Sequence, residues 1–141
     1  MSTSLQQLGL AVKRLQWRHH REMNRRLAPL GLSLVQWDTL RHLAANPGAS
    51  LHQLAELTFQ TDQSMGELAR RMVDRGLIER VDGPGRKVQH RLTPAGDELR
   101  RAGGESADSV LADSLGHLSV RERDTLHELL LKAMAEAGPG R

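Results

Sequence analysis

Hydrophobic residues recur at steps of three and four along most of this chain, which is the spacing of one face of an α-helix. The first such stretch, with Leu5, Leu8, Val12 and Leu15, predicts a long amphipathic helix over about residues 4 to 28. The helix breakers of "APLGLS" then follow at positions 28–33. The pattern therefore predicts a mainly helical protein whose first element is long.

Five further helices are predicted, because each later apolar stripe follows a Ser or Thr that can cap a helix N-terminus. Three of these residues have Gln or Glu three positions later, which completes a capping box. The predicted N-caps are Ser33, Ser50, Thr61, Thr93 and Ser119. The third helix is short, Leu51 to Leu57, and the fifth runs from about residue 94 to 114 through a Gly-Gly pair that could bend it.

The hydrophobic spacing changes to alternation between the fourth and fifth helices. "LIERV" (77–81) and "RKVQHRL" (86–92), joined by "DGPG", predict a β-hairpin. In the second strand, Val88, His90 and Leu92 should face inward and the intervening basic and polar residues outward. That outer row could contact phosphate, or it could only protect a strand edge from pairing. The two helices that precede the hairpin favour the first interpretation.

Composition narrows the fold class and the cellular setting. Of 141 residues, 38% are hydrophobic and 26% charged, as expected for one folded domain, and aromatic residues at 2% argue against a large all-β fold. We therefore expect a mainly α protein with a small hairpin. There is no cysteine, so disulfides and cysteine zinc sites are excluded. Without a signal-peptide pattern or an apolar run of roughly 20 residues, a cytoplasmic protein is expected.

Catalytic chemistry finds little support in the sequence. It has no Gly-rich phosphate loop, no nucleophile elbow and no paired carboxylates in an apolar context, so we expect no enzyme, no catalytic residue and no cofactor. Seven histidines raise the question of a metal site. His19 and His20 are adjacent and point to different faces of a helix, and no pair has chelating helical spacing. We expect no bound metal.

The order of the middle elements predicts a function. A short helix, a tight turn, a second helix and a basic hairpin form a winged helix-turn-helix, in which the second helix enters the DNA major groove. Arg86, beside the Gly-Pro-Gly turn, suits the negative potential of the minor groove. The residues expected to contact DNA are Ser50, Thr61, Gln63, Ser64, Gly66, Glu67, Arg70, Arg71, Arg86 and Lys87.

Three segments carry a resemblance to a known family. "LSLVQWDTLRHLA", "LAELTFQTDQSMGELARRMVDRGLIERV" and "GRKVQHRLTPAG" resemble the MarR family of winged helix-turn-helix regulators, continuously from about Gly31 to Gly96. The resemblance implies a homodimer that binds a palindromic operator, usually as a repressor, and that a small aromatic or phenolic effector releases. The wing is about two residues shorter than is common, with Pro84 at the usual acidic position, and Glu67 replaces a commonly basic or neutral residue.

The same resemblance implies a division of the chain within one compact domain. Residues 1–30 would form an N-terminal dimerisation helix, 31–93 the DNA-binding region and 94–141 the C-terminal dimerisation helices. The effector cleft of the family would correspond to Trp17, His20, Trp37 and Asp38.

Two alternatives remain open at this point. Trp37 is in register with Leu34 and Leu40, so it could belong to the core instead of an effector site. The same fold could also serve as a protein-interaction module without sequence-specific DNA binding.

Overall fold

The computed structural model describes residues 2–82, 85 and 88–135 and is mainly α-helical with one β-hairpin, as predicted. In chain order the elements are α1 (Leu5–Leu27), η1 (Ala28–Leu30), α2 (Leu34–Ala45), α3 (Leu51–Leu57), α4 (Asp62–Asp74), β1 (Ile78–Asp82), β2 (Val88–Leu92), α5 (Pro94–Leu115) and α6 (Val120–Met134). Each predicted helix is present, and the helix ends lie within two residues of the predicted ones.

The predicted helix starts owe their precision to local capping. The capping boxes at Ser33, Ser50 and Ser119 are all formed, and a further one at Ser4 begins α1. In each, the Ser hydroxyl accepts a hydrogen bond from a backbone N–H in the first turn, while the Gln or Glu side chain accepts one from the N-cap. These contacts span three residues, so sequence alone specifies them.

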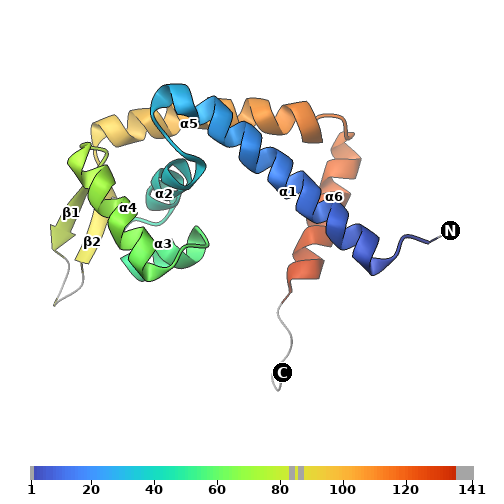
Figure 1. The fold of residues 1–141 in the computed structure, drawn as a ribbon, viewed down its shortest axis with the longest axis horizontal. Coiled ribbons are helices and arrows are strands. Elements are labelled where there is room, and N and C mark those ends of the chain that lie inside the picture. Colours follow the sequence, from blue (N-terminus) through green and yellow to red (C-terminus); the bar gives the residue numbers. More distant parts are fainter. Residues whose placement is uncertain (1, 83–84, 86–87, 136–141) are drawn as a thin grey trace, which may run out of the picture.

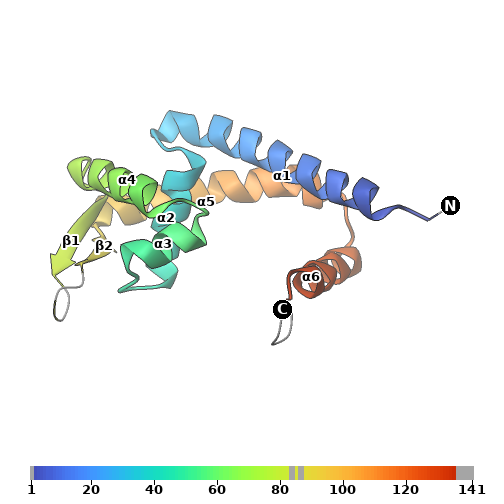
Figure 2. The ribbon, with the colours of Figure 1, turned by 60° about the horizontal axis from the view of Figure 1, so that its bottom comes forward.

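The molecule is elongated, with two long helices connecting a compact end to an open end (Figure 1). We call the compact end the head: it consists of α2, α3, α4 and the β1–β2 hairpin. Helices α1 and α5 lie side by side, and α6 turns away at the other end of α5, near the N-terminus, in both views (Figures 1 and 2). The arrangement separates the head from α6 and the N-terminal half of α1.

The core lies in the head and under the adjoining halves of α1 and α5. Its fully buried members of largest volume are Leu27, Leu40, Leu54, Met65, Met72 and Ile78. Each comes from a predicted apolar stripe or strand, so the inward faces were correctly predicted for these elements, whereas the apolar stripes of the first half of α1 and of α6 are exposed in the single chain. Burying a side chain of this size contributes about 1.5 to 3 kcal/mol each.

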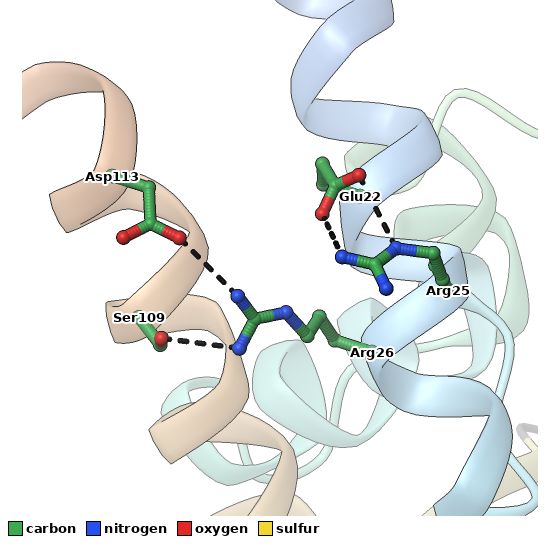
Figure 3. A network of polar contacts seen from close by, with 5 residues as sticks. All are labelled: Glu22, Arg25, Arg26, Ser109 and Asp113. Atoms are coloured by element: carbon green, nitrogen blue, oxygen red, sulfur yellow. Dashed lines mark hydrogen bonds and ion pairs between the residues drawn. The ribbon is translucent and has the colours of Figure 1, made fainter.

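Polar contacts join α1 to α5 beyond this core. Arg26 donates hydrogen bonds to Ser109 at 3.3 Å and to Asp113 at 3.2 Å, whereas Glu22 pairs with Arg25 within α1 (Figure 3). Two helical turns before Arg26 on α1, His19 Nε2 lies 3.0 Å from the Ser114 hydroxyl. The polar face of α1 is thus held against α5 over several turns.

The hairpin is antiparallel, with Ile78 opposite Leu92 and Arg80 opposite His90. His90 is buried, and Arg91 is exposed and pairs with Glu79, so the predicted alternation is confirmed at these two positions. Gln89, which was predicted to face outward, is half-buried, and its backbone bridges to Ser50. Strand β1 begins and ends one residue later than predicted. The predicted start of the second strand at 86–87 lies outside the described residues.

Helix α6 is the least covered element of the fold. None of its residues, Val120–Met134, is buried. Its exposed apolar side chains are Val120, Leu129, Leu130, Leu131 and Met134, and the first half of α1 likewise exposes Leu5, Leu8, Leu10 and Val12. Within the described part of the chain, no helix combines the length and apolar character that a membrane crossing requires.

Candidate nucleic-acid interface

Helix α4 has one buried face and one exposed polar face. Met65, Ala69 and Met72 are buried on the inner side, at steps of four and three. Because these steps fix the helix orientation, the polar residues between them point outward. Exposed on that outer face are Thr61, Gln63, Ser64, Glu67, Arg70 and Arg71. The structure therefore brings six predicted DNA contacts onto one accessible surface.

Gly66 lies among these residues and is half-buried. A Cβ built at this position would meet no atom within 4 Å. The glycine is therefore not required by packing within the chain, and its small size leaves room beside α4 that an outside molecule can use.

Ser50 connects α3 to the hairpin. Its hydroxyl accepts the backbone N–H of Gln53 at 3.1 Å, and its backbone forms an isolated bridge with Gln89 of β2. Ser50 therefore already has a structural role as an N-cap, in addition to the predicted contact with DNA. The two remaining predicted contacts, Arg86 and Lys87, lie outside the described residues.

The turn between α3 and α4 contains a conformation that the sequence did not reveal. Helix α3 ends with Gln60 N–H donating to Ala55 O at 2.8 Å and Phe59 N–H donating to Glu56 O at 3.3 Å. This is the Schellman arrangement, in which the residue in Phe59's position is usually Gly. Phe59 has φ 58° and is 94% exposed. The absence of Gly after the Leu51–Leu57 stripe was the only signal for it.

His52 forms a polar bridge at the same end of α4 that sequence reasoning also missed. Its Nδ1 lies 2.9 Å from Asp62 Oδ1, and its Nε2 lies 2.7 Å from Glu56 Oε1. The hydrogen bond that the His52 ring donates to Asp62, together with the negative charge of both carboxylates, raises the pKa of His52 above its ordinary value. The spacing of four residues between His52 and Glu56 was the available sequence signal.

A second histidine lies beneath a hollow between α4 and the hairpin. His90 is 6% exposed, and its Nδ1 has no hydrogen-bond partner among the described residues. The hollow, of about 360 Å³, is lined in part by Gly66, Arg70 and Arg80. Burial, and then the charge of Arg80, lowers the pKa of His90. The lowered pKa favours the neutral form of the ring inside the head.

Three of the four predicted effector-site residues meet at one place. His20, Trp37 and Asp38 line an open hollow of about 210 Å³ among α1, α2 and α5. Trp17 lies over a neighbouring hollow of about 320 Å³ that is rich in arginine, although its ring stacks on His20 with centroids 5.5 Å apart. Arg41, which sequence reasoning did not include, also lines the first hollow.

The two tryptophans have different environments. Trp37 is 8% exposed and donates from Nε1 to the Arg100 carbonyl at 3.0 Å, so most of its ring belongs to the core. Arg41 lies 5.0 Å from the centre of that ring and pairs with Asp38 at 2.7 Å. Trp17 is 56% exposed. The hollow thus combines an aromatic edge, a cation and a carboxylate.

Comparison with known proteins gives consistent results. A family model described as "MarR family" matches residues 30–87, which include α2, α3, α4 and β1. The transcriptional regulator HosA of Escherichia coli O111:H- is 31% identical over 105 residues, or 73% of this chain and 78% of that protein. The HTH-type transcriptional repressor Rv2887 of Mycobacterium tuberculosis is 29% identical over 113 residues, or 79% of this chain and 81% of that protein.

Solved structures of similar proteins share the fold of this chain. Rv2887 in complex with salicylic acid superposes with a TM-score of 0.75 at 27% identity, over 94% of this chain and 97% of that one. Rv2887 in complex with DNA has a TM-score of 0.75 at 25% identity, over 95% and 100% of the two chains. The similarity therefore includes the terminal helices as well as the head.

Proposed function

Because this chain belongs to the MarR family, we propose that it is a DNA-binding transcriptional regulator, a repressor that acts as a homodimer on a palindromic operator. The observation that carries the proposal is the exposed polar face of α4. Helix α4 packs against α3 and β1, and its outer face is left open beside the hairpin. That is the geometry in which a recognition helix enters the major groove.

The side chains of α4 suit the two parts of DNA recognition. Gln63 and Ser64, in the first turn, can bond to base edges, whereas Arg70 and Arg71, farther along, can bind phosphate. Glu67 can accept a hydrogen bond from a cytosine amino group. For the wing we propose Arg86 in the minor groove and Lys87 on the backbone, as the sequence pattern indicates.

The uncovered terminal helices support a homodimer. The apolar side chains of α6 and of the first half of α1 need a partner surface, and a second copy supplies the same surface in return. A twofold axis through these helices would place two copies of α4 in successive major grooves, about 34 Å apart. Such an assembly reads a palindrome because its own symmetry is twofold.

We further propose that an aromatic acid binds in the hollow of His20, Trp37, Asp38 and Arg41 and weakens DNA binding. The Arg41 guanidinium can pair with a carboxylate, and Trp37 offers an aromatic edge. The hollow lies between the head and the long helices. An effector that prefers a different angle between the head and the long helices changes the spacing of the two heads in the dimer. It lowers the affinity for DNA only as far as it binds this altered arrangement more tightly than the DNA-binding one.

Selection from a pool of random duplexes of about 30 base pairs, three helical turns, tests the proposal. We expect enrichment of a palindrome, here called the selected duplex, whose half-sites are about one helical turn apart. Gln63→Ala should change which bases are enriched. Arg70→Ala should weaken binding of all sequences similarly and make binding less salt-dependent.

The alternative function gives a different result in the same selection. A winged-helix protein-interaction module would enrich no sequence, and it would bind duplex DNA at low salt no more tightly than an unrelated protein of the same charge. That outcome would refute the proposed function.

A further inference from the structure

His52 lies between two carboxylates where the recognition helix begins. It belongs to α3, and its two ring nitrogens contact Glu56 of the same helix and Asp62, the first residue of α4. Among the described residues, the charged groups that act on the His52 ring are these two carboxylates, one from α3 and one from α4. The imidazole therefore connects the supporting helix to the start of the reading helix.

The segment from residue 50 to 64, which contains the His52 bridge, has few groups that can balance its acidic side chains. Between positions 50 and 64, His52 is the only side chain that can carry positive charge, whereas Glu56 and Asp62 are both acidic. The same segment supplies the proposed DNA contacts Ser50, Thr61, Gln63 and Ser64. A neutral His52 would leave two uncompensated carboxylates beside the phosphate backbone, where they are repelled.

We propose that His52 is a positioning residue for DNA binding: as an imidazolium it holds the Asp62 carboxylate toward α3 and offsets its charge where α4 enters the major groove. This inference rests on the proposed function. His52 lies on α3 and not on the exposed polar face of α4. Its role would be to make the acidic first turn of α4 compatible with DNA.

The chemistry of the bridge makes the proposal dependent on pH. Asp62 and Glu56 already raise the pKa of His52 in the free protein, and approaching phosphates favour the charged ring further. His52 is therefore charged below its raised pKa and loses its charge as the pH rises through it. DNA affinity should be highest on the acidic side and should fall toward alkaline pH.

A double-mutant cycle on the selected duplex tests the role of the pair. Wild type, His52→Gln, Asp62→Asn and the double variant are compared at about pH 6 and about pH 8, on either side of the ordinary histidine range. At the lower pH, His52→Gln should weaken binding about two- to fivefold, the range of an exposed charge pair. In the Asp62→Asn background the same change should have little effect.

Two controls separate the bridge from general effects. His42→Gln makes the same chemical change on α2, outside the α3–α4 turn, and should leave the pH dependence intact. In the protein without DNA, an NMR titration of the His52 ring should give a lower pKa in Asp62→Asn than in wild type. This measurement shows the pairing even where no DNA is bound.

The inference is overturned if His52→Gln costs the same affinity with and without Asp62, or if it leaves the pH profile of binding unchanged. It is also overturned if the His52 pKa is the same in wild type and Asp62→Asn. Failure of the proposed function is distinguishable, because wild type itself would then select no duplex.

Discussion

The indole of Trp37 lies directly on Gly103, so closely that a Cβ at Gly103 would be 2.3 Å from Trp37 Cδ1 and 2.7 Å from Nε1. The contact joins α2 to the middle of α5. The adjacent Gly104 has no such neighbour, since a Cβ there would meet nothing within 4 Å. The Gly-Gly pair thus contains one glycine that packing requires and one that it does not.

We predict opposite effects of alanine at these two positions. Gly103→Ala should destabilise the fold by about 1 to 3 kcal/mol, because Trp37 must move in a packed core. Gly104→Ala should stabilise it by up to about 1 kcal/mol through helix propensity. Urea unfolding of the two variants measures both effects. Equal effects of the two substitutions would contradict the packing of Trp37 on Gly103.

Phe59→Gly should stabilise the protein. Phe59 holds a left-handed backbone conformation, and its side chain, 94% exposed, gains little from burial. Glycine avoids the strain of a Cβ in that conformation, a gain of about 1 kcal/mol.

The matched control for this prediction is Phe59→Ala. It removes the ring but keeps the Cβ, so its melting temperature should stay close to that of wild type. If Phe59→Ala stabilised the protein as much as Phe59→Gly, the ring and not the backbone would be the source of the effect.

His90 should make the fold less stable in mild acid. Burial lowers its pKa below the ordinary 6.5. As the pH falls through 6.5, the unfolded chain takes up a proton that the folded chain still excludes, so the free energy of unfolding decreases. His90→Leu should remove this part of the pH dependence. Thermal melting from neutral to acidic pH measures it, and an unchanged slope would show that His90 does not contribute.

The opposite sign is expected for His52. Its raised pKa favours the folded state below the unfolded value, and this contribution disappears as the pH rises through the folded value. Single variants of the two histidines should therefore change the pH dependence of stability in opposite directions, which a comparison of His52→Gln with His90→Leu tests.

Leu130→Glu should dissociate the proposed homodimer. Leu130 is 40% exposed on α6, a helix with no buried residue in the single chain. In a twofold interface the substitution removes two buried leucine side chains, one from each copy, and each contributes about 1.5 to 3 kcal/mol of burial free energy. The dissociation constant of the dimer should therefore rise about a hundredfold or more. Light scattering across a dilution series measures the change.

Lys132→Glu provides the control, since it places the same carboxylate on the opposite side of α6. It should leave the mass at the dimer value. A wild-type protein that is monomeric at every concentration would contradict the proposed assembly directly.

The secondary structure was predictable because its causes are local. Ser33, Ser50 and Ser119 cap their helices through hydrogen bonds that span three residues, and in the helices of the head the periodicity of the apolar stripe identifies the buried face. Most of the candidate DNA surface follows in the same way. Once Met65 and Met72 are buried, the direction of Gln63 and Arg70 is determined by helix geometry.

Other features depended on contacts between residues far apart in the chain. The sequence could not show that Gly103 lies under Trp37, that His52 reaches Asp62, or that Trp17 and Trp37 line different hollows. These depend on how helices pack, which a periodic pattern does not encode. By itself the sequence determined the main helices and strands, the inward faces of those in the head and the order that indicates a winged helix. The tertiary structure decided which side chains meet, because packing and charge pairing act across elements that only the folded chain brings together.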